Sequence, residues 1–309
     1  MRTKVNMEQK LVTTIDHYAV PTAVVLADRL VGGELKDIFG DLEVASLVIA
    51  GKTVIEHTLL ELQELRVKQC TIFAGKNASR IQKLLEKESL WGMSVTVLNS
   101  SRSVDQVLSE FNDFDSNGGV LIIEADRLRS SCLKSLLRQT SGSEHLVFGV
   151  NGAGNRLGIT LKKSALLDVS MKPVAISQIL VNRLETAKDF QRANFDVVSG
   201  DYEGLEPGVM FNTQLGRRQH WTSHLSTSTI AASLGLAPNN KAYWSNVMID
   251  RHCKVGDAVK MESVILNHGV YVESGSNLEH TIVMPNSVVS SARALSDCIV
   301  HHDAIFDLS

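Results

Sequence analysis

A six-residue spacing of apolar side chains runs through residues 245–309 and constrains the fold more than any other feature of the chain. A helix repeats every 3.6 residues and a strand every two, so neither accounts for this spacing alone. A triangular coil does, because each of its short strands places one aliphatic side chain in a stacked core. The sequence therefore predicts a stack of short strands in this segment.

Two sets of positions carry the six-residue spacing. The first track, interrupted at Asn277, is Val247, Cys253, Val259, Ile265, Tyr271, Val283, Val289 and Leu295. The second track is Val264, Val270, Ser276, Ile282, Val288, Ala294, Val300 and Phe306. At about 18 residues per coil, the segment has room for three or four coils. The side chains expected in the interior are Val259, Ile265, Val270, Ile282 and Val288.

Length and composition limit the class of protein. A chain of 309 residues is longer than one average domain, so we expect two. The net charge of −3 offers no basic surface for nucleic acid. Residues 1–17 are polar, no apolar run reaches membrane-spanning length, and the four cysteines are scattered without a C-x-x-C pair. These features predict a cytoplasmic protein that binds neither nucleic acid nor membrane.

Upstream of the repeats, predicted strands alternate with predicted helices. The strands are residues 23–27, 69–74, 94–98, 119–124 and 145–150. The helices are residues 54–65, 78–88, 104–111, 132–139 and 188–193. This alternation predicts a mainly parallel sheet covered on both faces by helices. Ligands of such sheets bind beyond the carboxyl ends of the strands, which here lie near Asp28 and Asp126.

Three segments of this α/β part carry a family resemblance. Residues 49–59 (IAGKTVIEHTL) are similar to an I-x-G-K-P-L-I-E-H-T-L segment, with Thr53 in place of the proline. Residues 120–126 resemble a strand that ends in Gly-Asp, and residues 184–190 resemble a D-x-G-T-P-E-D segment. The family is that of the sugar-phosphate nucleotidyltransferases, such as mannose-1-phosphate guanylyltransferase and glucose-1-phosphate nucleotidyltransferase. The resemblance covers most of residues 21–195.

The resemblance implies an architecture for the whole chain. A Rossmann-like nucleotidyltransferase domain with a mainly parallel sheet is expected over residues 18–198. A connector follows over residues 199–244. Residues 245–309 are then expected to form a short left-handed β-helix of hexapeptide repeats, a segment in which such enzymes often end. Through this β-helix the chain is expected to form a homo-oligomer or to pair with an active paralogue.

Most of the residues that the family's chemistry needs are replaced. Nucleotidyl transfer builds charge on phosphate oxygens, so the protein must supply amides, cations and a metal ion. The family's Gly-rich loop corresponds to residues 28–33, where its paired glycines come late. The family's lysine aligns with Val44, and its second acidic metal ligand aligns with Arg183. Asp126 remains at the first metal position, and we expect Arg183 to pair with it.

The vestigial site therefore consists of a few residues. Arg29, Lys52 and Asp28 mark the nucleotide- or phosphate-binding positions, and Asp126 marks the metal position. We expect no catalytic residue and no cofactor, although an active enzyme would use Mg²⁺. The sequence predicts a catalytically degenerate homologue that acts as a regulatory, scaffolding or nucleotide-sugar-binding subunit. Its setting would be polysaccharide or nucleotide-sugar metabolism.

Two other functions stay open. An active sugar-1-phosphate nucleotidyltransferase with rearranged ligands would need Asp28, Glu124 or Asp168 close to Asp126. A hexapeptide acyltransferase would use a histidine of the repeats as a general base, in an acyl-donor groove between chains. The glycine-rich residues 152–158 follow a strand without opening a helix, so we interpret them as a hairpin turn and not as a phosphate loop.

Overall fold

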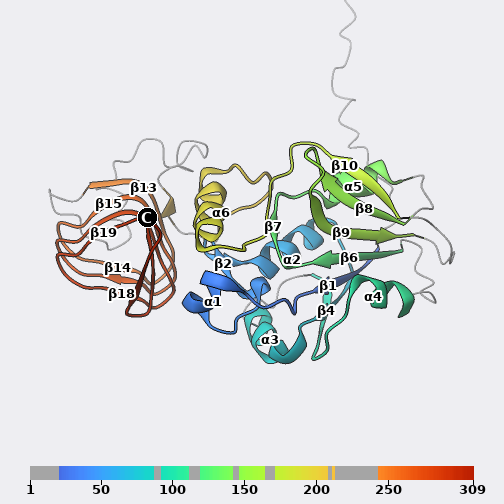
Figure 1. Cartoon of the computed structure of the whole chain (residues 1–309), viewed down its shortest axis with the longest axis horizontal. Coiled ribbons are helices and arrows are strands. Elements are labelled where there is room, and N and C mark those ends of the chain that lie inside the picture. Colours follow the sequence, from blue (N-terminus) through green and yellow to red (C-terminus); the bar gives the residue numbers. More distant parts are fainter. Residues whose placement is uncertain are drawn as a thin grey trace, which may run out of the picture.

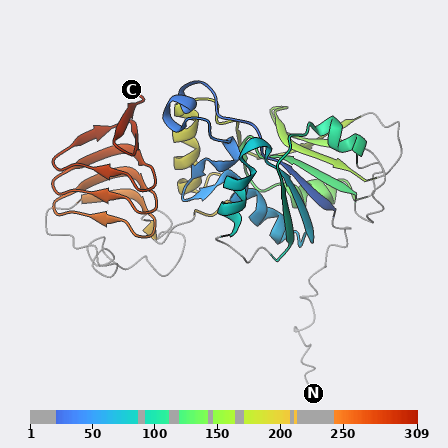
Figure 2. The same cartoon turned by 90° about the horizontal axis from the view of Figure 1, so that it is seen from below.

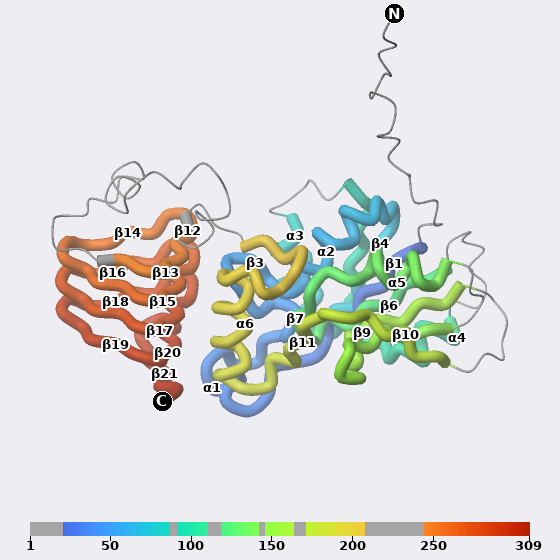
Figure 3. The backbone as a smooth tube through the Cα atoms, turned by 90° about the horizontal axis from the view of Figure 1, so that it is seen from above, coloured from blue at the N-terminus to red at the C-terminus, as the bar shows by residue number. Residues whose placement is uncertain are grey.

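The computed structural model has two parts that lie side by side, an α/β part and a C-terminal strand-rich region (Figures 1 and 3). The described residues are 21–86, 92–110, 119–141, 146–163, 171–207, 211–212 and 243–309. Asp168 and most of the predicted connector, residues 199–244, lie outside them.

The α/β part is built on a seven-stranded sheet. Its strands are β1 (Thr22–Leu26), β4 (Gln69–Phe73), β5 (Ser94–Leu98), β6 (Val120–Glu124), β8 (Val147–Asn151), β9 (Arg156–Lys162) and β10 (Lys172–Ile176). Their order across the sheet is β10-β8-β9-β6-β1-β4-β5. β1 pairs in parallel with β4 and β6, while β9 is antiparallel to both β6 and β8. The predicted parallel-rich sheet is confirmed, with β9 as the exception.

Helices cover both faces of this sheet. On one face lie α2 (Val54–Glu64), α3 (Ala78–Glu86) and α5 (Leu133–Gln139), and on the other lies α4 (Val104–Glu110). Two further helices, α1 (Gly33–Phe39) and α6 (Ala187–Ser199), belong to a separate buried cluster. Alternate residues of β1 point to opposite faces, as the pleat of a strand requires. Ala23 and Val25 pack with α2, α3 and α5, whereas Val24 and Leu26 pack with Val107 of α4. The five helices predicted from periodicity are confirmed, and α1 is an additional one.

Two local features position the elements around the sheet. Thr53, which replaces the family's proline, caps α2: its hydroxyl accepts from Glu56 N, and the Glu56 carboxylate accepts from Thr53 N. The short strands β2 (Val48–Ile49) and β3 (Lys52–Thr53) lead into this cap. The predicted hairpin turn lies between β8 and β9, with Asn151 Oδ1 accepting from Asn155 N at 2.9 Å, and residues 156–158 of the predicted turn already belong to β9.

The strand-rich region stacks mainly parallel strands in a regular register, and its first and last strands, β12 and β21, are antiparallel to their neighbours. Its strands are β12 (Phe211–Asn212), β13 (Tyr243–Ile249), β14 (Lys254–Val255), β15 (Lys260–Leu266), β16 (Tyr271–Val272), β17 (Asn277–Val283), β18 (Val288–Val289), β19 (Ala294–Ser296), β20 (Cys298–His301) and β21 (Ala304–Asp307). Val247 pairs with Val264, and Val264 with Thr281, so each strand position returns after 17 residues. Figure 2 shows the resulting stack in red and orange.

The 17-residue repeat explains why neither six-residue track stays in the interior. Three steps of six residues make 18, one more than a coil contains, so a strict track moves relative to the interior in every coil. Along the first track, Val247 and Val259 are in the interior cluster, Ile265 lies outside it, Tyr271 is 43% exposed, and Val283 is inside again. The polar Asn277 falls on the outward part of this track, where it is exposed.

The predicted interior is therefore wrong at three of its five positions. Val259 and Val270 lie in the interior as predicted. Ile265 and Ile282 are fully buried, but on the outer surface of the strand stack, in a cluster shared with the α/β part. Val288 is 42% exposed, and the interior position is taken by its neighbour Val289.

The junction between the two parts is an apolar contact. Four apolar side chains on the outer surface of the strand stack, spaced 17 residues apart, belong to the same buried cluster as residues of α1 and α6. They are Met248, Ile265, Ile282 and Ile299. From the α/β part, Leu35, Ile38 and Phe190 belong to the same cluster. Within the described ranges, hydrogen bonds also cross the junction, from Gln191 Nε2 to His280 O and between His301 Nδ1 and Ile38 O, both 2.8 Å.

Candidate functional site

Charged side chains gather where the parallel strands β1 and β6 end. Arg29 follows β1, Glu124 is the last residue of β6, and Asp126 and Arg127 come directly after it. β1 and β6 are neighbours in register, with Leu26 opposite Glu124, so their carboxyl ends meet at one edge of the sheet. We call these four residues the strand-end cluster. This edge is where ligands of α/β sheets usually bind.

Two arginine side chains donate hydrogen bonds to the carboxylate of Asp126. Arg127 donates from Nε to Oδ1 at 2.6 Å and from Nη2 to Oδ2 at 3.0 Å, a two-pronged contact. Arg29 donates from Nη1 to Asp126 Oδ2 at 3.3 Å and to the backbone oxygen of Asp126 at 3.0 Å. The side chain of Asp126 is 16% exposed and that of Arg127 only 6%. Both carboxylate oxygens thus have cationic partners from the chain itself.

Arg127 is held in place by the neighbouring strand β9. Its Nη1 donates to Arg156 O at 3.0 Å. Gly158 has a φ of +67°, and a Cβ there would lie 2.8 Å from Arg127 Nε, so glycine leaves the guanidinium room to pass. Burial opposes the charge of Arg127, but its hydrogen bond to Asp126 and the charges of Asp126 and Glu124 outweigh burial and raise its pKa.

The donor set of the cluster does not fit Mg²⁺. The ion needs oxygen ligands, usually carboxylates. Both Asp126 oxygens are already bound by guanidinium groups, and Glu124 Oε2 lies 3.7 Å from Nη2 of Arg127, which donates to Asp126. Burial raises the pKa of Glu124 above its usual value, against the opposing charge of Arg127. Among the described residues, no three His, Cys, Asp or Glu side chains converge as metal ligands would.

The predicted pair of Arg183 and Asp126 does not form as expected. Arg183 Nη1 lies 3.6 Å from Glu185 Oε1, and both side chains are mostly exposed. The counter-charge of Asp126 comes from Arg29 and Arg127 instead. Arg183 nevertheless lies near enough to Glu124 for its charge to oppose the rise of that pKa.

The other predicted positions have separate surroundings. Lys52 Nζ donates to Glu206 O at 3.0 Å, so its partner is outside the strand-end cluster. Asp28 lies beside Gly75, where a Cβ would come within 3.0 Å of Asp28 Cβ. Val44, aligned with the family's lysine, is completely buried in the apolar cluster of the junction. Gly33, from the glycine pair after β1, begins α1.

The sequence did not indicate the partner of Asp126 or a second ion pair beneath the cluster. Arg127 is the residue next to Asp126, and its role depends on Gly158 of another strand. Arg129 Nη2 lies 3.1 Å from Glu61 Oε2, with both side chains buried. Glu61 Oε1 also accepts from Leu133 N at 2.8 Å, at the start of α5. The sequence feature that could have indicated these contacts is the pair of arginines, Arg127 and Arg129, that follows β6 at a spacing of two residues.

The histidines of the strand-rich region have structural contacts. His280 Nδ1 lies 3.7 Å from Asp297 Oδ1, and its ring meets Phe195 of α6 edge-on. His301 packs against Phe39 of α1, and burial lowers its pKa. These two residues lie at the junction, so they support docking of α1 and α6 more directly than general-base chemistry.

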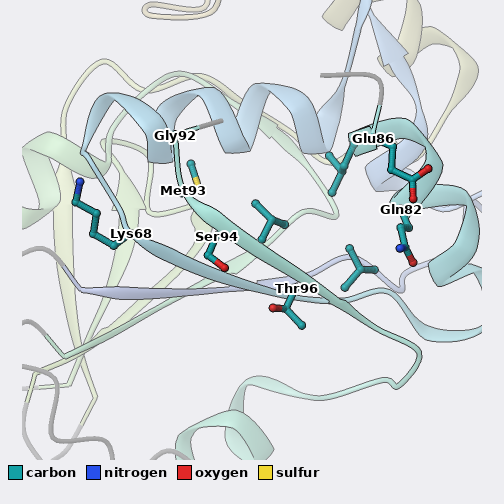
Figure 4. Close-up of a pocket in the computed structure, with 10 residues that line it drawn as sticks. Lys68, Gln82, Glu86, Gly92, Met93, Ser94 and Thr96 are labelled. Atoms are coloured by element: carbon teal, nitrogen blue, oxygen red, sulfur yellow. The ribbon is translucent and has the colours of Figure 1, made fainter. Parts of the chain in front are cut away.

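Two larger pockets lie away from the strand-end cluster. One, of about 720 Å³, lies along the outer edge strand β5, with Lys68 and Glu86 on opposite sides (Figure 4). It adjoins the amino-terminal ends of β4 and β5, opposite to the strand ends that usually bind ligands. The other, of about 650 Å³, lies between α1, the start of α6 and β21. Neither contains a predicted site residue.

Comparisons with known proteins leave the family open. No protein-family model matches the sequence, and no curated protein matches it either. Within the described part of the chain, no helix combines the length and apolar character that crossing a membrane would require.

Proposed function

We propose that this protein is a catalytically degenerate relative of the sugar-phosphate nucleotidyltransferases that works as a regulatory or scaffolding subunit. The occupied carboxylate of Asp126 is the observation that carries the proposal. Its oxygens are bound by Arg29 and Arg127, so the position that resembles the family's metal ligand has a protein counter-ion. The buried Val44 supports the same conclusion, because valine cannot neutralise a phosphate.

A turnover assay tests the proposal. The full chain is incubated with a sugar 1-phosphate, a nucleoside triphosphate and Mg²⁺, and pyrophosphate release is measured. We expect no release above background, because losing two charge-stabilising contacts of about 3–4 kcal/mol each slows transfer roughly 10⁴-fold or more. The double variant Val44→Lys with Arg183→Asp should stay inactive too. Robust turnover by the wild-type chain would overturn the proposal and favour the active enzyme with rearranged ligands.

A binding screen separates the possible non-catalytic roles. A nucleotide-sugar that binds only the folded chain raises its melting temperature by mass action. We propose that any such ligand binds without requiring Mg²⁺, since the strand-end cluster already neutralises Asp126. Thermal unfolding with and without nucleotide-sugars and Mg²⁺ measures this. A shift that depends on Mg²⁺ would contradict the interpretation of Asp126.

We further propose that the strand-rich region is a left-handed β-helix of hexapeptide type. Three observations support it: parallel pairing, a 17-residue return and corner residues with positive φ at the same interval. One corner column is Asn246, Ser263, His280 and Asp297, and a second is Ala258, Gly275 and Ala292. Each corner reverses the chain between short strands.

A scaffolding role needs a surface for a partner. Tyr271 and Val288 pair in register on β16 and β18, on the outer side of the strand stack, and are 43% and 42% exposed. We propose that copies of this chain, or a paralogue, meet here. Sedimentation analysis of the full chain should give an oligomer, and the double variant Tyr271→Ser with Val288→Ser should weaken it. A monomer at all concentrations would remove self-association from the proposal.

A further inference from the structure

A small cavity lies between α2 and β7 (Leu128–Arg129), and Arg127 of the strand-end cluster is part of its lining. Its volume is about 10 Å³. Its lining includes polar side chains that are almost completely buried: His57, Thr58, Glu61 and Arg129 are each at most 7% exposed. Buried polar groups in native proteins nearly always have hydrogen-bond partners, so each polar atom of this lining is expected to have one.

Two atoms of this lining have no hydrogen-bond partner among the described residues: His57 Nδ1 and Arg129 Nε. The other polar atoms are bonded. Thr58 Oγ1 donates to Val54 O at 3.1 Å, and Glu61 accepts from Arg129 Nη2 at 3.1 Å. A buried polar atom left without a partner costs about 1–3 kcal/mol. Two residues that line the cavity therefore each have one polar atom without a hydrogen-bond partner.

The chemistry of the two atoms is complementary. His57 Nε2 lies 3.1 Å from Ile49 O, and a carbonyl only accepts, so Nε2 carries the proton of the neutral ring. Nδ1 is then a bare acceptor, whereas Arg129 Nε is always a donor. One molecule that both donates and accepts can serve both atoms at once.

We propose that the cavity holds one ordered water molecule that donates to His57 Nδ1 and accepts from Arg129 Nε. A room of about 10–15 Å³ suits a single water, and such waters usually make about three hydrogen bonds. Glu61 and Thr58, which also line the cavity, offer oxygens for the second hydrogen of the water. The water joins α2 to β7, the strand that follows Arg127. This inference does not depend on the proposed function.

A crystal structure of the full chain with resolved waters tests this directly. We expect a density peak about 2.7–3.2 Å from both His57 Nδ1 and Arg129 Nε. In solution, the Arg129 Hε proton should show a cross-peak to bound water. The indole Nε1–H of Trp244 is a control, because Trp244 is also buried but donates to Val259 O and lies outside the cavity. An absent peak, or a rotamer that bonds either atom to the protein, would overturn the proposal.

A pair of variants tests the same site by occupancy. Val54 lines the cavity, so Val54→Ile adds a methyl group to its wall, while Val54→Thr keeps its volume. We expect the Arg129 Hε cross-peak to water to be lost in Val54→Ile and kept in Val54→Thr. Retention in both variants would place the water elsewhere and contradict the assignment. If Val54→Ile does not fold, the wild-type crystal structure and cross-peak still decide the question.

Discussion

At the strand ends of the α/β part, charged side chains bind one another, whereas at the junction with the strand-rich region the contacts are almost entirely apolar. Asp126 is surrounded by Arg29 and Arg127, while Ile265 and Ile282 are fully buried with α1 and α6. The first place is the edge of the sheet at which α/β enzymes usually bind their ligands. The second place is more apolar than the usual interface between domains that move independently.

This difference indicates which contacts contribute most to the stability of the folded chain. An apolar contact stabilises in proportion to the area removed from water, at about 25 cal/mol per Å². A partly exposed ion pair contributes far less, because water screens it and two side chains must be ordered. We therefore expect substitutions at the junction to lower stability more than substitutions in the strand-end cluster.

The largest effect is expected from Ile282→Asp. The substitution places a charge in the apolar junction, where Ile282 is fully buried, and should cost about 4 kcal/mol or more in the free energy of unfolding. Ala294→Asp is the control, because Ala294 lies two steps further along the same six-residue track but is exposed. It should cost about 0.5 kcal/mol. Urea-induced unfolding measures both, and equal losses would contradict the 17-residue register.

A pH-dependent loss of stability is expected from His57. Burial lowers its pKa from 6.5 to about 4, with the charge of Lys52 adding to the effect and the hydrogen bond to Ile49 opposing it. The folded chain holds the ring neutral while the unfolded chain binds a proton below pH 6.5. Stability from this group is therefore complete above pH 6.5 and is lost as the pH falls toward 4, by about 3 kcal/mol in total.

Unfolding measured from pH 7.5 to pH 4 in wild-type and His57→Gln proteins tests this expectation. The variant should have a shallower dependence of unfolding free energy on pH. His252→Gln is the control, because His252 is exposed at a turn of the strand-rich region. If both variants keep the wild-type dependence, the acid sensitivity arises at other groups and the His57 prediction is wrong.

A smaller loss is expected from Asp126→Asn. The change leaves Arg127, which is 6% exposed, without its main counter-charge. Breaking a fully buried pair costs about 3–5 kcal/mol, and the partial exposure of Asp126 and Arg29 reduces this to about 2 kcal/mol. Glu185→Gln, which breaks the exposed pair with Arg183, should cost about 0.5 kcal/mol or less. A gain in stability for Asp126→Asn is typical of a working active site and would contradict the structural role.

The sequence predicted the parts of the fold that depend on local periodicity. β1 and α2 carry apolar residues at strand and helix spacing, and both were found within one residue at each end. α1 was missed because it begins at Gly33, directly after Gly32, and a pair of glycines predicts a loop. The interior of the strand stack was misjudged because a difference of one residue per coil leaves no mark on a six-residue pattern.

The candidate site depended on contacts that sequence spacing does not record. Asp126 was identified by resemblance, and its position after β6 follows from the strand pattern. Its partner could not be inferred, because Arg127 reaches the carboxylate only where Gly158 of β9 leaves space. The ion pair of Glu61 and Arg129 joins residues 68 positions apart. Such long-range pairs depend on the antiparallel β9 and the packing of α2, which periodicity alone does not predict.

The smallest effect is expected from a polar contact within the junction itself. Gln191 of α6 donates from Nε2 to His280 O at 2.8 Å, but the contact is exposed, so water can replace it when the side chain is removed. Gln191→Ala should therefore cost only about 0.5–1 kcal/mol, the net value of one hydrogen bond. Gln82→Ala on the exposed side of α3 is the control, since both changes raise helix propensity equally. A loss for Gln191→Ala as large as that for Ile282→Asp would mean that polar contacts hold the two parts together. That outcome would reverse the comparison between an apolar junction and an ion-paired strand end.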